Sequence, residues 1–496
     1  MTSTRTTDAA GRATEFDAVV VGAGPNGLAA AVTLARAGLT VAVFERASTA
    51  GGGASTAELT LPGFRHDVCS AVHPLALESA FFRAFEIDKR VDFVRPDVSF
   101  AHPLDRGSAI AYRDLARTRE GLGRDGRAYE ALLRPLARHA DHVAQTTGTP
   151  LLRIPDHPLS ALSLGLRSFE QGTALWNARF RDEAAPALLT GVSAHTILPL
   201  PSIAAAGAGL ALTAYAHARG WPLPVGGSQS MMDALVRDLE DHGGRVVLSH
   251  EVTDLRELPS ARVQLLDVTP RALLSMAGDA LPPRYRRALR RFRYGNAAAK
   301  VDFALSAPIP WRDPALRAAP TLHLGGTRAE IAAGERQVAR GIHPDSPYVL
   351  VSQPSLFDAT RAPAGSYTVW AYTHVPRGSG EDRAEAVIAQ IERFAPGFRD
   401  TILAVSSRSA VDLAHHNPSY PGGDIAAGSP DLRQIVRRPV LSAHPWRTPV
   451  RGLYLSSAST APGPGVHGLP GWHAALTALR DEFGISEPPD LSLDAR

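Results

Sequence analysis

The chain has 496 residues, of which 44% are hydrophobic and 20% charged, and its formal net charge is only +3. A near balance of 52 basic and 49 acidic residues argues against a nucleic-acid-binding surface, so no nucleic-acid partner is expected. The single cysteine, Cys69, excludes an internal disulfide and is typical of a reducing compartment. The first residues lack the apolar core of a secretory signal, and no run reaches the ~18 apolar residues of a membrane span. We therefore expect a cytoplasmic protein of two or more structural units, with peripheral membrane contact left open.

The first predicted unit is a strand, turn, helix and second strand near the N-terminus. Residues 16–21 (FDAVVV) form an apolar strand, residues 22–27 read GAGPNG, and residues 28–37 predict a helix. A second strand over residues 40–44 ends at Glu45. These parts, in this order within about thirty residues, are the fingerprint of a dinucleotide-binding fold.

Each part of this fingerprint has a physical role. Gly22 permits the tight turn, Gly24 lets backbone N–H groups reach a pyrophosphate, and Gly27 lets the helix pack onto the strand. The helix N-terminus then faces the anion, and Glu45 would accept hydrogen bonds from the adenosine ribose. The fingerprint alone does not separate NAD from FAD. The residues predicted to contact the nucleotide here are Gly22, Ala23, Gly24, Pro25, Asn26, Gly27, Glu45 and Arg46.

A second glycine cluster follows in "TAGGGAST", residues 49–56. Its place after the ribose acid resembles the second motif of the FAD-dependent amine oxidase and phytoene desaturase superfamily, where two glycines pass under the pyrophosphate and the flavin. The resemblance implies that the cofactor is FAD. The usual family pattern is Gly-Gly-Arg, and Gly53 stands in the arginine position, so one phosphate contact of the family is in doubt. The cofactor contacts that the resemblance implies here are Gly51, Gly52, Gly53, Ala54 and Ser55.

The central part of the chain alternates between the two predicted domains. Residues 81–221 are predicted to be largely helical, and the alanine-rich run 203–216 is expected to be a buried helix. Residues 221–252 resemble the family's central dinucleotide-domain segment, with a Gly-Gly turn, a helix and a strand. The resemblance implies that the backbone of Val252 meets the adenine and that residues 263–270 return toward the cofactor.

Three side chains are candidates for catalysis. Lys300 stands in an apolar, strand-like run, residues 295–311, and matches approximately the lysine that holds a water against the reactive flavin nitrogen in amine oxidases. If Lys300 is buried its pKa should fall, which suits a proton shuttle; the alternative is a surface lysine at a strand edge. His73 follows the second glycine motif and His467 lies in the C-terminal glycine-rich loop, and a structural role is the alternative for both. No histidine pair has metal-ligand spacing with an acid nearby, so no metal is expected.

The C-terminal stretch "RGLYLSSASTAPGPGVHGLPGW", residues 451–472, resembles the closing motif of the superfamily. It predicts a strand over 453–456, a glycine-rich loop and a helix. The resemblance implies that the helix N-terminus faces the flavin pyrimidine carbonyl and stabilises the anionic reduced flavin. Val466 lies where amine oxidases often carry an aromatic ring, which favours an apolar substrate over an amine. The cofactor contacts that the resemblance implies are Ser457, which stands where glycine is common, with Ser459, Thr460, Gly463, Gly465, Val466 and His467.

The predicted fold class is α/β: a Rossmann-type, glutathione reductase-like FAD-binding domain with an inserted mixed α+β substrate domain. A sheet floor under a helical roof would enclose an apolar cavity over the flavin. The discontinuous FAD domain is predicted over residues 1–80, 222–302 and 440–485, the substrate domain over 81–221 and 303–439, and flexible termini over 1–15 and 486–496.

The predicted function is that of an FAD-dependent dehydrogenase or desaturase. A small apolar substrate, isoprenoid or polyketide-like, would pass a hydride to the flavin, which oxygen, a quinone or another acceptor would reoxidise. Three alternatives stay open: a redox-neutral polyene isomerase, an amine oxidase, and a non-enzymatic binder like the escorts of prenylated GTPases. The intact glycine motifs at both ends disfavour the last. The oligomeric state is not predicted.

Overall fold

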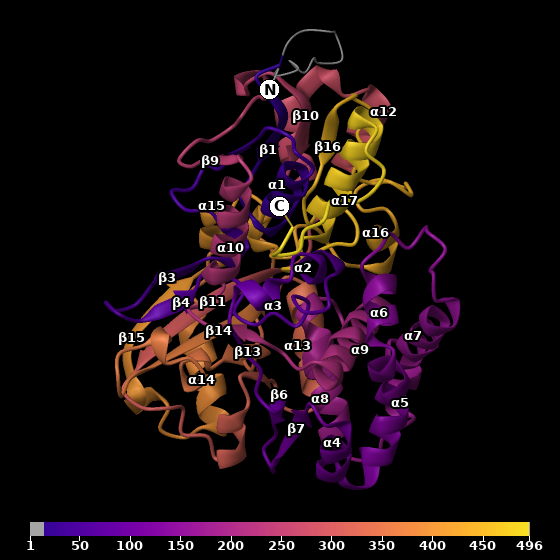
Figure 1. Cartoon of the computed structure of the whole chain (residues 1–496). Coiled ribbons are helices and arrows are strands. Elements are labelled where there is room, and N and C mark those ends of the chain that lie inside the picture. Colours follow the sequence, from indigo (N-terminus) through magenta and orange to yellow (C-terminus); the bar gives the residue numbers. More distant parts are fainter. Residues whose placement is uncertain (1–13, 496) are drawn as a thin grey trace.

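The computed structural model describes residues 14–495, so most of the predicted flexible segment 1–15 lies outside the described residues. Figure 1 shows two lobes: the N-terminal strand and the C-terminal helix share the upper lobe, and most of the central chain forms the lower one. The two larger sheets of the described part, one of five and one of seven strands, form the cores of these lobes. The fold is therefore the mixed α/β arrangement that the sequence predicts.

The upper lobe contains a five-stranded parallel sheet assembled from distant segments. Its order is β16 (Leu453–Leu455), β10 (Ala261–Leu266), β1 (Phe16–Val21), β2 (Val41–Phe44) and β9 (Arg245–Val247). Every pairing is parallel, with β1 at the centre between β10 and β2. The short apolar strands are buried because helices cover the faces of such a sheet. This sheet is the Rossmann-like part of the chain.

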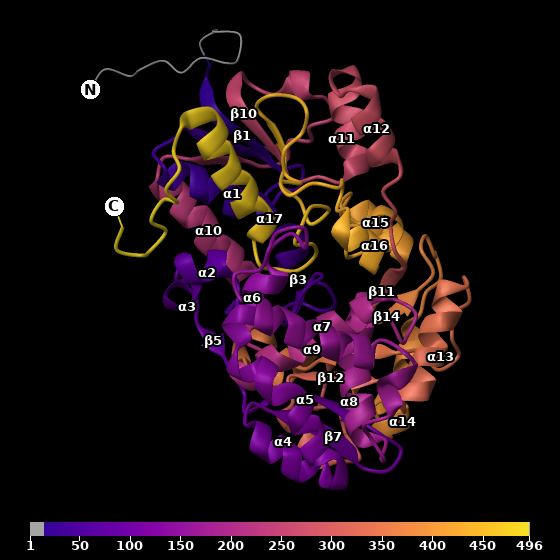
Figure 2. The same cartoon turned by 90° about the vertical axis from the view of Figure 1, so that its right-hand side faces the viewer.

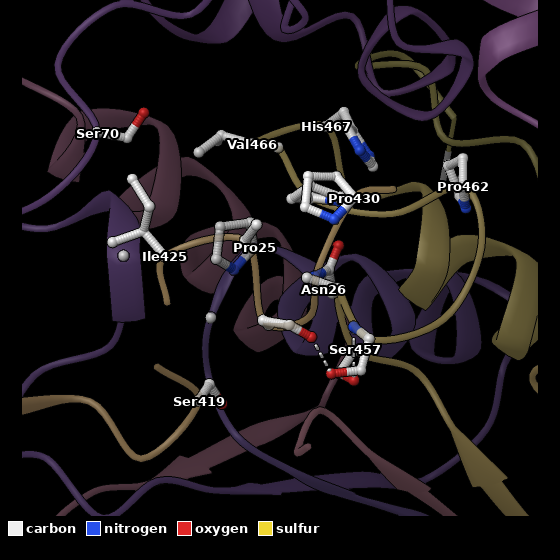
Figure 3. Close-up of a pocket in the computed structure, with 18 of the residues that line it drawn as sticks. Pro25, Asn26, Ser70, Ser419, Ile425, Pro430, Ser457, Pro462, Val466 and His467 are labelled. Carbon is white, nitrogen blue, oxygen red and sulfur yellow. Dashed lines mark hydrogen bonds between the residues drawn. The ribbon is translucent and has the colours of Figure 1, made fainter. Parts of the chain in front are cut away.

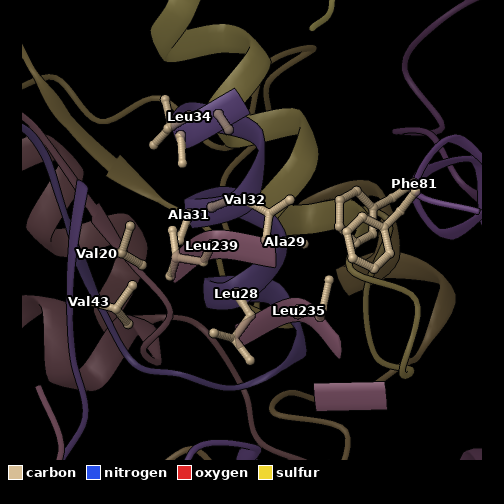
Figure 4. Packing of buried hydrophobic residues seen from close by; sticks show 14 of the residues in the cluster. Val20, Leu28, Ala29, Ala31, Val32, Leu34, Val43, Phe81, Leu235 and Leu239 are labelled. Atoms are coloured by element: carbon tan, nitrogen blue, oxygen red, sulfur yellow. The ribbon is translucent and has the colours of Figure 1, made fainter. Parts of the chain in front are cut away.

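Helix α1 (Pro25–Arg36) packs between this sheet and two other helices, α10 (Gln229–Asp241) and α17 (Leu469–Ala478). Figure 4 shows its apolar side chains meeting Val20 and Val43 of the strands on one side and Leu235 of α10 on another. The helix begins at Pro25, three residues before the predicted start, because proline at the first helical position lacks an N–H that would be unpaired there in any case. The N-termini of α1 and α17 come to lie together.

The lower lobe contains a seven-stranded, mainly antiparallel sheet. Only the pairing of β12 with β6 is parallel among its described strands. The predicted domain boundary at residue 302 falls inside its strand β11. The strand order is β15 (Ile402–Arg408), β11 (Ala297–Leu305), β14 (Tyr367–Val375), β13 (Val349–Ser352), β12 (Thr321–Leu324), β6 (Val98–Pro103) and β7 (Ser108–Tyr112).

The two faces of this sheet differ because side chains alternate along each strand. On one face Val301, Phe303 and Val369 pack against Ile391 of α14 (Ala384–Phe394). The other face is covered by helices, several of them drawn in magenta in Figure 2. These helices are α4 (Leu115–Gly121), α5 (Gly126–Arg138), α6 (Ala140–Thr147), α7 (Pro158–Gln171), α8 (Ala184–Ser193), α9 (Ile203–Ala218) and α13 (Arg328–Ala339).

The remaining described elements lie outside the two larger sheets, and α11 (Pro270–Ala277) and α12 (Pro283–Arg290) pack on the five-stranded sheet of the upper lobe. None of the described helices is both long and apolar enough to cross a membrane. The run 203–216 is part of α9, which is largely buried, as expected. The C-terminal residues 486–495, predicted to be flexible, are hydrogen-bonded here: Arg36 donates to the carbonyl of Ala495 at 2.8 Å and Leu491 is buried. These remaining elements are β3 (Thr56–Glu58), β4 (Arg65–Asp67), α2 (Ala80–Ala84), α3 (Ile87–Arg90), β5 (Phe93–Val94), β8 (Leu223–Pro224), α11, α12, α15 (Ala410–His416) and α16 (Leu432–Val436).

Candidate functional site

A single continuous cavity of about 1360 Å³ joins the two lobes. It starts at the carboxyl ends of β1, β2 and β10, where Val21, Phe44 and Asp267 line it, and continues to the cavity-facing side of the seven-stranded sheet. Ligands of open α/β sheets bind at the carboxyl ends of the strands. Because typical small-molecule pockets measure about 300–1,000 Å³, this volume leaves room for two ligands side by side.

The first glycine turn and Glu45 form one hydrogen-bonded unit at the start of the cavity. Glu45 accepts hydrogen bonds from the backbone N–H groups of Ala23 at 2.7 Å and of Ala47 at 2.8 Å. A Cβ on Gly27 would overlap the carbonyl oxygen of Gly22, so the close approach predicted for Gly27 is made to the turn itself. The side chain of Arg46 is directed to the carbonyl of His415, at 2.9 Å. Because its two oxygens accept the hydrogen bonds from Ala23 and Ala47, the carboxylate of Glu45 lines the cavity in a fixed position.

Asp267 is a site residue that the sequence reasoning missed. It follows β10 directly, and its Oδ2 accepts a hydrogen bond from the N–H of Gly27 at 3.0 Å. Burial raises the pKa of Asp267 to about 7, and the carboxylate of Glu45 adds to the shift. A large share of this carboxyl group is therefore neutral near pH 7. Its position after a central parallel strand is the signal that would have identified it.

The second glycine cluster is bound to the first and contacts an unpredicted tyrosine. The N–H of Gly51 donates to the carbonyl of Ala23 at 2.8 Å, which joins the two glycine segments. A Cβ on Gly53 would overlap the hydroxyl of Tyr420, so this hydroxyl fills the space that a side chain at residue 53 would enter. Burial raises the pKa of Tyr420 well above its usual value, so the hydroxyl stays protonated. No local pattern in the sequence connects Tyr420 with Gly53, which lies in a distant segment.

The closing loop between β16 and α17 seals the upper end of the cavity. Figure 3 shows its Val466 and His467 facing the same space as Pro25 and Asn26 from the start of α1. A Cβ on Gly471 would overlap the carbonyl oxygen of Asn26, so the glycine lets α17 approach α1 closely. The Nδ1 of His467 accepts a hydrogen bond from the N–H of Leu469 at 3.1 Å. Burial lowers the pKa of His467 to about 4, so it is neutral at pH 7.

A buried arginine, Arg438, connects this loop with the segment around residue 427. Its guanidinium donates to the carbonyls of Ala458 at 2.9 Å, Gly428 at 3.1 Å and Ala426 at 2.5 Å. Burial lowers the pKa of Arg438 to about 10, which leaves it cationic at neutral pH. Arg438 also lines the cavity, so it contributes a positive charge there. Arg438 could not be identified from the sequence, because nothing in the local sequence distinguishes this buried arginine from the exposed arginines around it.

Lys300 lies on the cavity-facing side of β11 and is buried with a carboxylate partner. Its Nζ donates to Asp302, whose other oxygen lies 3.5 Å from Nδ1 of His66. The Nζ is also 5.7 Å from the ring centroid of Trp370. Burial lowers the pKa of Lys300, although Asp302 opposes the shift. The alternative of a surface lysine is excluded because Lys300 is buried, and its role as a proton shuttle stays a prediction.

His73 also lines the cavity and is almost fully buried. Its Nε2 is 2.8 Å from Oγ of Ser228, and its buried Nδ1 has no hydrogen-bond partner among the described residues. Burial lowers the pKa of His73 to about 4. The ring is therefore a neutral group in the lining of the cavity.

The lower part of the cavity is a chamber between the sheet and the helices; we call it the chamber from here on. Trp370 and Tyr372 of β14 lie on its floor with their rings nearly perpendicular and the centroids 5.2 Å apart. At its far end, Nε2 of His195 is 2.8 Å from Nε2 of His323. Small residues of two helices form the roof of the chamber and leave space below it. They are Ala204, Gly207, Ala208 and Ala211 of α9 with Ala161 and Gly165 of α7.

Most of the predicted site residues come together in this cavity, although their segments are far apart in the sequence. No group of three histidine, cysteine, aspartate or glutamate side chains able to hold a metal ion occurs in residues 14–495. The predicted site residues that line the cavity are Gly22, Gly24, Pro25, Asn26, Glu45, Arg46, Gly52, Gly53, Ser55, His73, Val252, Lys300, Ser457, Ser459, Gly465, Val466 and His467. The predicted residues Ala23, Gly27, Gly51, Ala54, Thr460 and Gly463 are not part of the lining.

The fold and this site define a Rossmann-like dinucleotide-binding protein with a second, ligand-sized chamber. Residues 20–85 match the family model described as "NAD(P)-binding Rossmann-like domain". The chain is 27% identical to pyridine nucleotide-disulfide oxidoreductase domain-containing protein 2 of Rattus norvegicus, over 94% of each chain.

Two solved structures share the fold at low sequence identity. One is an oxidoreductase from Methanosarcina mazei, with a TM-score of 0.58 and 17% identity over 93% of this chain and 99% of that one. The other is putrescine oxidase bound to putrescine, with a TM-score of 0.60 and 18% identity over 95% of this chain and 99% of that one. At these identities the likeness concerns the fold.

Proposed function

We propose that this chain is an FAD-dependent oxidoreductase of the dehydrogenase or desaturase type that acts on an apolar substrate. The observation that carries the proposal is the continuity of the cavity, which runs from the dinucleotide fingerprint past Lys300 into the chamber. A cofactor bound along the two glycine motifs would therefore extend toward whatever occupies the chamber. The similarity of the whole chain to proteins named as oxidoreductases supports the same reading.

The residues at the upper end fit FAD. Glu45 offers a carboxylate for ribose hydroxyls, and the N-termini of α1 and α17 offer two helix dipoles to anionic groups. Asp267 would repel a pyrophosphate if it were charged, but its pKa of about 7 allows it to be protonated beside one. Bound flavin would supply the hydride acceptor. The cation of Arg438 adds a favourable charge to the same part of the cavity.

The chain's own groups would orient the substrate, exclude water and move a proton. Aromatic and small apolar side chains line the chamber, and these favour a substrate such as an isoprenoid or polyketide-like chain. Lys300 is the candidate for proton movement, because burial lowers its pKa toward the range in which an amine exchanges protons near neutral pH. Oxygen or a quinone is the proposed acceptor.

An amine oxidase is the second candidate function. Trp370 and Tyr372 on the chamber floor, with the ring of Trp370 5.7 Å from Nζ of Lys300, provide the aromatic surface that Val466 does not. Aromatic faces attract alkylammonium groups. The similarity of the fold to putrescine oxidase is compatible with this alternative.

The affinity for FAD tests the cofactor assignment through Glu45. We expect Glu45→Ala to weaken FAD binding by about 1–3 kcal/mol, because charge-assisted hydrogen bonds are lost. The reduction of the bound flavin should remain nearly unchanged, since the ribose is far from the reactive ring. Titration of the apoprotein with FAD, followed by flavin fluorescence, measures the affinity.

A matched control for this variant is Glu251→Ala. Glu251 also lines the cavity, but its exposed carboxylate lies 3.8 Å from Arg46 and should contribute little. Equal affinity losses in the two variants, or a large change in flavin reactivity with Glu45→Ala, would contradict the placement of the ribose.

A further inference from the structure

Exposed apolar side chains are concentrated in a short part of the chain between residues 151 and 175. Ile154 is 91% exposed and Leu159 81% exposed, although such side chains usually lie in a protein core. Contiguous exposed apolar surface marks an interaction site. We call the following exposed residues the apolar patch: Leu151, Leu152, Ile154, Leu159, Leu162, Leu166, Phe169 and Leu175.

Helix α7 carries both the patch and part of the chamber wall. Its patch residues recur every three or four positions and so share the outer face, while Leu164 and Ser168 line the chamber on the inner side. The arginine of this helix, Arg167, donates to the carbonyl of Leu132 at 2.9 Å and to Ser163. The guanidinium of Arg167 is thus directed toward the carbonyl of Leu132 and the hydroxyl of Ser163, and its charge does not lie among the patch residues on the outer face of α7.

The patch and the cavity share residues. Leu151 of the patch lines the cavity, and so do Gly165 of α7 and Leu432 at the start of α16, both of which are exposed. Both views of the molecule place α16 above α7 (Figures 1 and 2). The outer apolar surface and the wall of the chamber are therefore separated by little more than α7 and the loop before it.

Basic side chains stand among these leucines. Arg153 lies between Leu152 and Ile154, Arg433 lies on α16 and Arg437 directly follows that helix; all three are exposed. The acidic residue of the same loop, Asp156, accepts a hydrogen bond from Gln145. Arginines beside exposed leucines match the chemistry of an anionic lipid surface, which offers phosphate groups above hydrocarbon.

We propose that the apolar patch docks on an anionic lipid surface and that the chamber takes its substrate from that surface. A second copy of the chain is a poorer occupant, because it would cover Leu151, which lines the cavity, and block access from this side. The uptake of substrate rests on the reaction proposed above, whereas docking on lipid does not, since binding to lipid can be measured without turnover.

Vesicle co-sedimentation of the full chain tests the proposal. We expect binding to phosphatidylglycerol–phosphatidylcholine vesicles, at least tenfold weaker binding by L159S/L162S/L166S, and several-fold weaker binding by R153Q/R433Q/R437Q. The matched control is L248S/I342S/L403S, which replaces apolar residues that are 40%, 52% and 50% exposed in other parts of the surface. It should bind like the unchanged chain, and circular dichroism should show that all variants are folded.

Three results would overturn the proposal. One is no binding of the unchanged chain to the phosphatidylglycerol–phosphatidylcholine vesicles, and another is an equal loss with the patch and control variants. The third is sedimentation as a dimer that L159S/L162S/L166S dissociates, without vesicle binding, which would identify the patch as an interface between copies.

Discussion

Replacing Gly471 by alanine is expected to destabilise the fold by about 1–3 kcal/mol or more and to abolish tight FAD binding. The new Cβ would overlap the carbonyl oxygen of Asn26, a backbone atom that cannot rotate away. Helix α17 must then move off α1, and the two helix N-termini at the upper end of the cavity would separate. Urea-induced unfolding and FAD titration measure the two effects.

The matched control is Gly334→Ala, also inside a helix. A Cβ there would find its nearest neighbour, Pro344, at an ordinary 3.8 Å. Because alanine is the better helix former, this variant should be more stable by roughly 0.5–1 kcal/mol and should bind FAD normally. Unchanged stability and FAD affinity in Gly471→Ala would show that α17 does not need its close contact with α1.

Replacing Lys300 by methionine is expected to slow turnover by about 10²-fold or more, in the step that transfers a proton. The methionine keeps the length of the side chain but has no group that exchanges a proton. Asp302 would remain buried without its partner, and burial already raises its pKa, so it would take up a proton and stay neutral. Stopped-flow measurement of flavin reduction and reoxidation separates the affected step.

Asp302→Asn distinguishes this role from a structural ion pair. The negative charge of Asp302 raises the pKa of Lys300, so its removal should lower that pKa further. If the neutral amine accepts the proton, the rise of the rate with pH should move to lower pH in this variant. Unchanged turnover in Lys300→Met, or a pH profile that stays in place in Asp302→Asn, would leave Lys300 a structural residue.

The nucleotide end of the site could be predicted because its determinants are local. Strand, glycine turn and helix follow one another within a few residues, and each limits the backbone that the next can adopt. Errors there are small, such as the start of α1 at Pro25 and the end of β16 at Leu455. The need for glycine at position 27 follows from the same local geometry, because a Cβ there would overlap the carbonyl oxygen of Gly22.

The chamber could not be predicted to the same extent, because distant segments build it. Tyr420 fills the space beside Gly53 only once the chain between them has folded, and Arg438 is buried by the loops that it connects. The hydrogen bond between His195 and His323 joins a helical turn to a strand 128 positions later. Neither ring carries a sequence signal that sets it apart from other histidines.

Anaerobic reduction of the FAD-loaded protein by a panel of lipids, polyenes and amines tests the proposed reaction most directly. We expect the visible absorbance of the oxidised flavin to bleach with an apolar isoprenoid or polyketide-like compound and not with simple amines. Reduction by an amine alone would establish the second candidate function in its place. Product formed only with pre-reduced flavin and without net reduction would identify an isomerase, and a protein that binds no FAD at all would contradict the account as a whole.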